Sequence, residues 1–87
     1  MVPVDLQVFP NPSNGKVTVT ARSIGRTGAD LSVVDALGRE LQRESIALDN
    51  NGDQWTLDLS ELARGVYFVK IETTQGVLVR KLLLEGE

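Results

Sequence analysis

The sequence predicts an all-β fold, and within that class a seven-stranded antiparallel β-sandwich of the immunoglobulin-like type. Six turn signals divide its 87 residues into seven short segments, a spacing that is typical of small sandwiches. Several segments alternate apolar and polar residues with a period of two, as strands with one solvent-exposed face do. No segment of the sequence sustains the 3.6-residue periodicity of a helix.

Length and composition set the scale of the fold. A chain of 87 residues supports one hydrophobic core, so we expect a single domain that covers residues 1–87. With 41% apolar and 24% charged residues, the composition is that of a globular protein. The predicted turns lie at Pro10–Gly15, Ile24–Ala29, Ala36–Gly38, Asp49–Asp53, Ser60–Gly65 and Thr74–Gly76.

The first strand ends at a corner that is rich in proline. In Phe9-Pro10-Asn11-Pro12, the two prolines fix φ at two positions and remove two amide donors. We expect a rigid, exposed corner, which suits a recognised surface, although a stiff loop would explain the same residues.

Alternation predicts which side chains face the core in three of the strands. The expected inward residues are Val17, Val19 and Ala21 in Lys16–Arg22, Trp55, Leu57 and Leu59 in Gln54–Leu59, and Tyr67, Val69 and Ile71 in Val66–Thr73. We expect Trp55 to anchor the core. Tyr67 is expected to bury its ring while its hydroxyl finds a partner, and Phe68 to be partly exposed.

The remaining segments include a tight hairpin and two strands that depart from simple alternation. The strand Leu31–Val34 is followed by a tight hairpin, Asp35–Arg39, in which Gly38 would adopt the left-handed conformation. In Arg39–Leu48 the apolar positions change parity from Leu41 to Ile46, which predicts a β-bulge between them and a bend near Arg43–Ser45. In Val77–Leu84 both parities carry apolar residues, for which burial on both sides is one explanation.

Composition excludes most catalytic chemistry. The chain has no His and no Cys, which removes the commonest general base, the commonest zinc ligands and the thiolate nucleophile. Turn capping explains Asp35 and Asp58 more simply than a catalytic carboxylate pair. Ser60 is better explained as the N-cap of one helical turn, with Leu62 folding back onto the core. We therefore expect no enzymatic activity, no metal site and no cofactor.

Charge and loop composition also argue against two kinds of ligand. A net charge of −3 and scattered basic residues argue against nucleic-acid binding. Gly25-x-x-Gly28 has the spacing of one RNA-binding loop, but that loop is flanked by helices and this one by strands. Asp49–Asp53 places oxygen side chains as calcium loops do, yet it lacks their glycine and final glutamate. A hairpin turn is the favoured interpretation.

The order of these features resembles one protein family. The first strand ends in Pro-Asn-Pro, the central turn reads Asp-x-x-Gly-Arg, Leu57–Leu62 leads into Gly-Val-Tyr, and the last strand contains Gly-x4-Lys. From Leu6 to Leu84 the chain is similar to the C-terminal sorting domain of the bacterial type IX secretion system. The positions that match the family's recurring residues are Pro10, Asn11, Pro12, Gly38, Arg39, Gly65, Tyr67 and Lys81.

The resemblance implies a C-terminal secretion signal that carries a cargo protein across the outer membrane of Bacteroidetes and is then cleaved off. The implied partners are components of the type IX translocon, the signal-cleaving cysteine peptidase and an N-terminal cargo domain. The implied route runs through the periplasm to the cell surface or the extracellular medium. An alternative function is a fibronectin-like or carbohydrate-binding accessory module of a secreted enzyme.

Physical arguments divide the eight matched residues. Gly38 and Gly65 suit turns that need unusual backbone angles, and Tyr67 suits the core, so these three are expected to be structural. The residues with the better claim to contact a partner are Pro10, Asn11, Pro12, Arg39 and Lys81. If the last strand lies at a sheet edge, it could accept a strand from the translocon or from another copy of the chain, with Lys81 limiting unspecific pairing.

Overall fold

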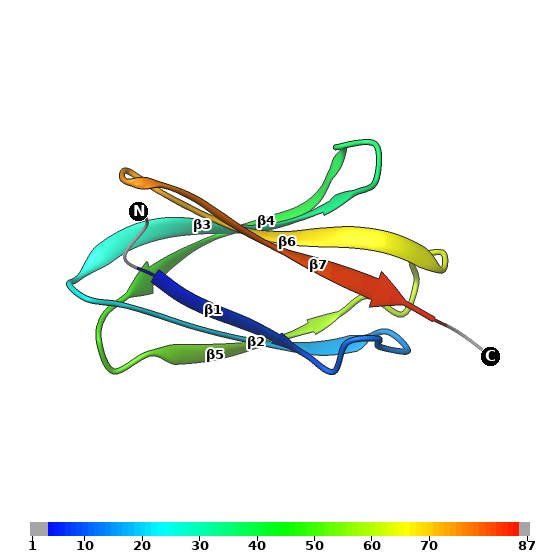
Figure 1. The fold of residues 1–87 in the computed structure, drawn as a ribbon, viewed down its shortest axis with the longest axis horizontal. Helices are drawn as coiled ribbons and strands as arrows, with labels where there is room; N and C mark the ends of the chain where they lie inside the picture. Colours follow the sequence, from blue (N-terminus) through cyan, green and yellow to red (C-terminus); the bar gives the residue numbers. More distant parts are fainter. Residues whose placement is uncertain (1–3, 86–87) are drawn as a thin grey trace.

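The computed structural model describes residues 4–85, which form seven strands and contain no helix (Figure 1). Within this part of the chain, no helix has the length and apolarity that a membrane span requires. The strands are β1 (Val4–Phe9), β2 (Lys16–Ser23), β3 (Thr27–Asp35), β4 (Glu40–Leu48), β5 (Asp53–Asp58), β6 (Gly65–Thr73) and β7 (Gly76–Leu84).

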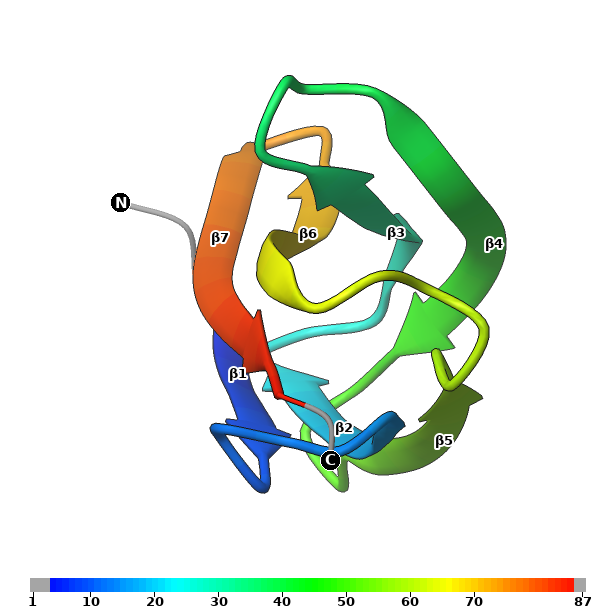
Figure 2. The same ribbon diagram turned by 90° about the vertical axis from the view of Figure 1, so that its right-hand side faces the viewer.

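The strands form two stacked antiparallel sheets, which confirms the predicted sandwich (Figure 2). One sheet has the order β1-β2-β5 and the other has the order β4-β3-β6-β7. In constant immunoglobulin domains the fourth strand pairs with the sheet of the first, second and fifth strands. Here β4 pairs with β3 instead, so the larger sheet has β4 and β7 as its two edges.

The core lies between the sheets and is built from the inward positions of the strands. The inward faces predicted for β2, β5 and β6 are confirmed, although Trp55 is half-buried against the core rather than fully enclosed. The buried apolar residues are Leu6, Val17, Val19, Ala21, Ala29, Leu31, Val33, Leu48, Leu57, Leu59, Tyr67, Val69, Ile71, Leu82 and Leu84.

The bulge in β4 lies at Leu41 itself, so its predicted position between Leu41 and Ile46 was wrong. Val33 pairs with Gln42 while its neighbour Val34 pairs with Glu40, which leaves Leu41 without a partner in β3. The parity of the apolar residues could not locate the bulge, because the inward positions of β4 include two exposed polar residues, Gln42 and Glu44. Inward polar residues on an edge strand discourage pairing with other chains.

Two predicted local structures take other forms. The Asp49–Asp53 turn is not a hairpin, because it joins β4 and β5, which belong to different sheets. Ser60 does not cap a helix, because residues 59–64 form turns instead. Its backbone N–H and its hydroxyl both donate to Oδ1 of Asp58, at 3.1 and 2.6 Å. Leu62 does pack against the core, as expected.

The last strand buries one face only, so burial on both sides is not the reason for its apolar character. Leu82 and Leu84 point into the core and are 0% and 4% exposed. Val77 and Val79 lie on the outer face and are 44% and 43% exposed. The apolar residues of both parities therefore divide between the core and an exposed outer surface.

Tyr67 joins the core to the turn that precedes β6. Its ring is buried, and its hydroxyl donates a hydrogen bond of 2.5 Å to the backbone oxygen of Ala63, which confirms both expectations for this residue. A tyrosine near the start of the corresponding strand makes the same kind of bond in immunoglobulin-like sandwiches.

Gly15 is required by a close approach between two turns. Its carbonyl oxygen accepts a hydrogen bond of 2.7 Å from the backbone N–H of Leu59. Its φ is +132°, and a Cβ at this position would lie 2.8 Å from Cα of Ser60. An added methyl group would therefore force the two turns apart as well as strain the backbone.

We predict that Gly15→Ala lowers the free energy of unfolding by about 1–3 kcal/mol, which is the typical cost of a strained residue. Urea unfolding followed by Trp55 fluorescence measures the change. Gly28→Ala is the matched control, because a methyl group added at Gly28 would meet only open space and its φ is not left-handed. It should leave stability unchanged or raise it by about 0.5 kcal/mol. Equal stability of the two variants would contradict the close approach.

Candidate functional site

The eight predicted recognition residues lie toward one end of the sandwich, which we call the proline end. It is formed by residues 10–15, 36–39 and 59–64, which join consecutive strands, and by the end of β7 (Figure 1, right-hand side). The predicted residues lie in these connections or in the adjoining parts of β6 and β7. Folding thus brings together residues that are up to 71 positions apart in the sequence, from Pro10 to Lys81.

Asn11 binds the backbone of the last strand with both ends of its amide group. Its Nδ2 donates to the carbonyl oxygen of Lys81 at 2.8 Å, and its Oδ1 accepts from the N–H of Leu83 at 3.0 Å. These two backbone groups lie on the same side of β7, so the Asn11 amide makes the two hydrogen bonds that a neighbouring strand would make there.

Ser13 continues this pairing with its backbone. Its N–H donates to the oxygen of Leu83 at 2.9 Å, and its own oxygen accepts from the N–H of Glu85 at 2.8 Å. The pairing is a parallel bridge between Ser13 and Leu84. The chain therefore leaves the smaller sheet after β1 and joins the edge of the larger one. We call Asn11–Ser13 the crossing segment.

The side chain of Ser13 holds the crossing segment to the start of β2. Its hydroxyl donates to the backbone oxygen of Lys16 at 2.9 Å and accepts from the N–H of Gly15 at 3.1 Å. Ser13 is 4% exposed, whereas Pro10 and Pro12 are exposed. The proline corner therefore presents its rings to solvent, while hydrogen bonds of Asn11 and Ser13 hold its backbone in place.

Asp35 organises the turn that contains Gly38 and Arg39. Its Oδ1 accepts from the N–H groups of Leu37 and Arg39, both at 2.9 Å, and its Oδ2 accepts from Nε of Arg39 at 2.7 Å. Gly38 has a φ of +86°, as the predicted turn requires. The backbone hydrogen bond from Arg39 is the main reason that the pKa of Asp35 lies below its ordinary value of 3.8.

Gly65 and Tyr67 have structural positions at the start of β6. Gly65 has a φ of +149° and pairs with Leu84 of β7. Tyr67 pairs with Asp35 on one side and with Leu82 on the other, so it links the central turn to the last strand. Both residues hold parts of the proline end in place.

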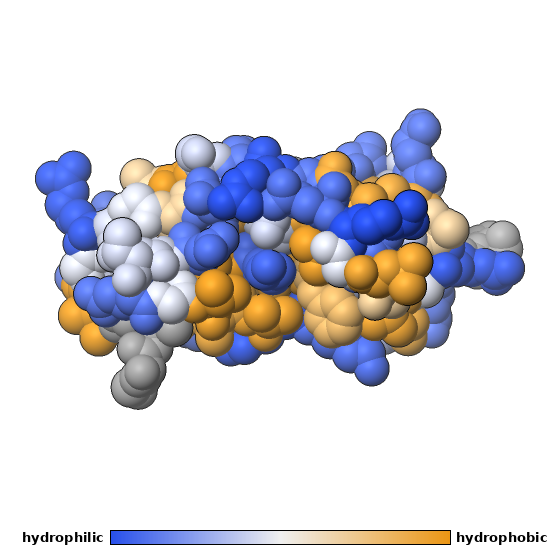
Figure 3. Space-filling view, turned by 90° about the horizontal axis from the view of Figure 1, so that it is seen from above, coloured by the Kyte–Doolittle hydropathy of each residue, from blue (hydrophilic) through white to orange (hydrophobic). Residues whose placement is uncertain are grey.

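Lys81 differs from the other matched residues because its side chain is exposed on the outer face of the larger sheet. It pairs with Phe68 of β6, and Val79 and Leu83 are its outward neighbours along β7. No carboxylate among the described residues forms an ion pair with it. Figure 3 shows that apolar side chains gather on this face along one long side and one end. Lys81 is thus an exposed cation in apolar surroundings.

Two features of the site were not predicted from the sequence. Ser13 carried no signal of its own, since a serine after a proline fits any turn. Arg80 has the inward parity of β7, where a charged residue needs a partner, and this could have singled it out. Its Nε donates to the oxygen of Leu6 in β1 at 3.2 Å, and its Nη1 donates to the oxygen of Val79 at 3.1 Å. Arg80 therefore links the edges of the two sheets.

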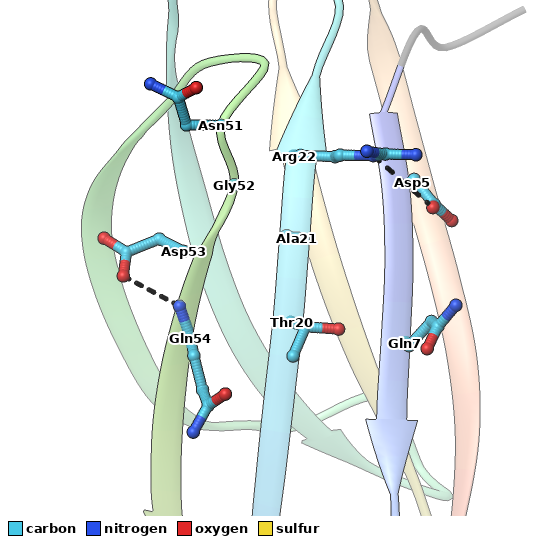
Figure 4. Close-up of a pocket in the computed structure, with 9 residues that line it drawn as sticks. All are labelled: Asp5, Gln7, Thr20, Ala21, Arg22, Asn51, Gly52, Asp53 and Gln54. Carbon is cyan, nitrogen blue, oxygen red and sulfur yellow. Dashed lines mark hydrogen bonds and ion pairs between the residues drawn. The ribbon is translucent and has the colours of Figure 1, made fainter.

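A depression of about 520 Å³ lies on the outer face of the smaller sheet (Figure 4). Asp5 and Arg22 form an exposed ion pair there, with 3.8 Å between the nearest atoms. The lining consists of Asp5, Gln7, Thr20, Ala21, Arg22, Asn51, Gly52, Asp53 and Gln54. It includes no aromatic ring, which sugar-binding surfaces commonly use for stacking. Residues 4–85 contain no cluster of three or more potential metal ligands.

The fold and the proline end define a small β-sandwich that holds exposed side chains in fixed positions. A family model, the secretion system C-terminal sorting domain, matches residues 7–85. The chain belongs to this family of type IX secretion sorting domains. The family serves the export of cargo to the cell surface or the extracellular space, through interaction with the secretion machinery, and it is not catalytic. None of the curated proteins compared with the chain matches it.

We predict that Asn11→Ala lowers the free energy of unfolding by about 1 kcal/mol, because two hydrogen bonds to β7 are lost. The amide of Leu83 should also exchange its hydrogen faster, as NMR can measure. Asn14→Ala is the matched control, since Asn14 lies in the same connection and makes none of these bonds. Unchanged exchange at Leu83 in Asn11→Ala would show that the amide does not bind the last strand.

A second prediction concerns acid stability. The pKa of Asp35 is lowered by folding, so its contribution is complete above 3.8 and is lost as pH falls through the lower folded-state value. Asp35→Asn should therefore be less stable than the wild type near neutral pH, and the difference should shrink as the pH falls below 3.8. Thermal unfolding across this range measures it. A difference that stays constant with pH would contradict the role of the carboxylate.

Proposed function

We propose that residues 1–87 act as one detachable sorting domain at the C-terminus of an exported cargo. The domain is delivered to the periplasm with its cargo, is bound there by components of the type IX translocon, and accompanies the cargo across the outer membrane. A cysteine peptidase then removes it. The match of the family model to residues 7–85 is the observation that carries this proposal.

The geometry of the proline end supports recognition of the folded domain. The rings of Pro10 and Pro12, the guanidinium of Arg39 and the ammonium of Lys81 are exposed. Internal hydrogen bonds fix the backbone beneath these side chains, so a partner can bind them without ordering a loop first. We propose that these four side chains contact the translocon, while Asn11, Gly38, Gly65 and Tyr67 keep them in position.

The alternative function, a fibronectin-like or carbohydrate-binding accessory module, has less support. The fold suits it, but fold alone does not assign a function. The lining of the depression in Figure 4 lacks the aromatic side chains that such a site would need.

The proposal predicts that an inert reporter fused to residues 1–87 is exported by a cell with a type IX system. Lys81→Ala should lower the exported fraction several-fold, because a contact to the translocon is lost. Arg26→Ala should export like the wild type, since Arg26 is an exposed cation at the opposite end of the sandwich. Cell fractionation measures export, and thermal unfolding of each purified variant shows whether it is folded.

Two outcomes would contradict the proposal. Retention of the wild-type fusion in the periplasm would refute the sorting function. Export of Lys81→Ala at the wild-type level would leave sorting intact but remove Lys81 from the recognised surface.

A further inference from the structure

Successive residues of β7 direct their backbone N–H and C=O groups alternately toward β6 and away from it. The oxygen of Lys81 and the N–H of Leu83 point away from β6, because both bind Asn11. Backbone direction in an antiparallel pair repeats every two residues, so the N–H and C=O groups of Val77 and Val79 also point away from β6. The strand therefore presents a row of backbone groups along its whole outer edge.

The crossing segment covers only the last part of this row. Its first hydrogen bond is to the oxygen of Lys81, and the others involve Leu83 and Glu85. No backbone group among residues 4–85 pairs with the outward groups of Val77 and Val79. The oxygen of Val79 accepts a side-chain bond from Arg80. We call Val77–Lys81 the open edge.

The open edge has little of the usual protection of edge strands: its one inward-facing charge, Arg80, binds the oxygens of Leu6 and Val79. It contains no proline and no bulge, and its register with β6 is continuous. Val77 and Val79 expose nearly half of their surface beside it. Lys81 supplies the only charge on the outward face of this stretch. Such an edge is suited to accept an additional strand.

We infer that the open edge is the docking site for an extended strand of a partner protein in the export machinery. This inference rests on the sorting function proposed above. The partner strand places apolar side chains beside Val77 and Val79 and a carboxylate beside Lys81. The crossing segment already binds the same edge in a strand-like manner, so the partner extends a pairing that the fold itself has begun.

Charge favours a different protein over a second copy of this chain. Antiparallel pairing of two β7 strands about Val79 would place Lys81 beside Val77. Parallel pairing in register would place Lys81 beside its own counterpart, which repels it. Neither arrangement supplies a carboxylate to Lys81, whereas an acidic partner strand does.

The experiment uses the purified full chain and a capped peptide, Glu-Thr-Val-Thr-Val-Thr-Glu. The peptide can present Val and Glu to the open edge in either strand direction. At millimolar peptide we expect hydrogen exchange at the amides of Val77, Val79 and Lys81 to slow by about tenfold or more. The amides of Leu78 and Leu82 point toward β6 and should change little. NMR detects each amide separately.

Peptide controls test the backbone and the charge. The same peptide with N-methyl groups on its Val and Thr residues should not bind, because it lacks the backbone N–H donors that a paired strand provides. A version with Lys in place of Glu should bind more weakly to the wild type. Lys81→Glu should reverse this preference, since the charge at the edge is then inverted.

A matched pair of protein variants tests the same edge in the cell. Val79→Lys should abolish peptide binding and lower reporter export several-fold. Thr56→Lys should affect neither, because Thr56 is an exposed position in β5, an edge strand of the other sheet. If the wild-type fusion is not exported, the sorting function fails, and peptide binding still tests the edge.

Four results would overturn the inference. One is exchange at Val77 and Val79 that the peptide does not change, and another is equal binding of the methylated peptide. The third is protection of these amides that rises with protein concentration alone, which would assign the open edge to a second copy of the chain. Equal export of Val79→Lys and Thr56→Lys would also count against it, with the sorting function left standing.

Discussion

The pairing of the crossing segment with the last strand is the constraint on which the proline end depends. Asn11 and Ser13 together make four hydrogen bonds to the backbone of residues 81–85. β1 belongs to one sheet and β7 to the other, so this pairing fastens the sheets together near both ends of the described chain. It also holds Leu82 and Leu84 in the core, because the backbone between them is bound on both sides. Without it, the last strand would have an open edge along its full length.

This arrangement separates the residues that build the proline end from those that it displays. Asn11, Ser13, Asp35 and Tyr67 direct their polar atoms to backbone groups of the same end. Other side chains at this end, including Lys81, are exposed to solvent. In the proposed function, this division would let the machinery bind one fixed surface on different cargoes.

Local pattern predicted most of the fold but few of its contacts. Alternation identified the inward faces of β2, β5 and β6, because each has one buried face. It misplaced the bulge of β4, since a single strand does not show where its partner shifts register. It could not choose the inner face of β7, whose outer face is also apolar. The residues that the resemblance singled out lie at the proline end, yet the sequence could not reveal that Asn11 binds a strand about 70 residues away. These hydrogen bonds give Asn11 a structural contact that the sequence did not predict.

The hydrogen bonds between the crossing segment and β7 can be detected directly in solution. NMR can measure scalar couplings across a hydrogen bond, from the donor nitrogen to the acceptor carbonyl carbon. We expect couplings from the Ser13 nitrogen to the Leu83 carbonyl and from the Glu85 nitrogen to the Ser13 carbonyl. The amides of Leu83 and Glu85 should also exchange more slowly than that of Val79. Absence of both couplings, with all three amides exchanging at one rate, would contradict this pairing.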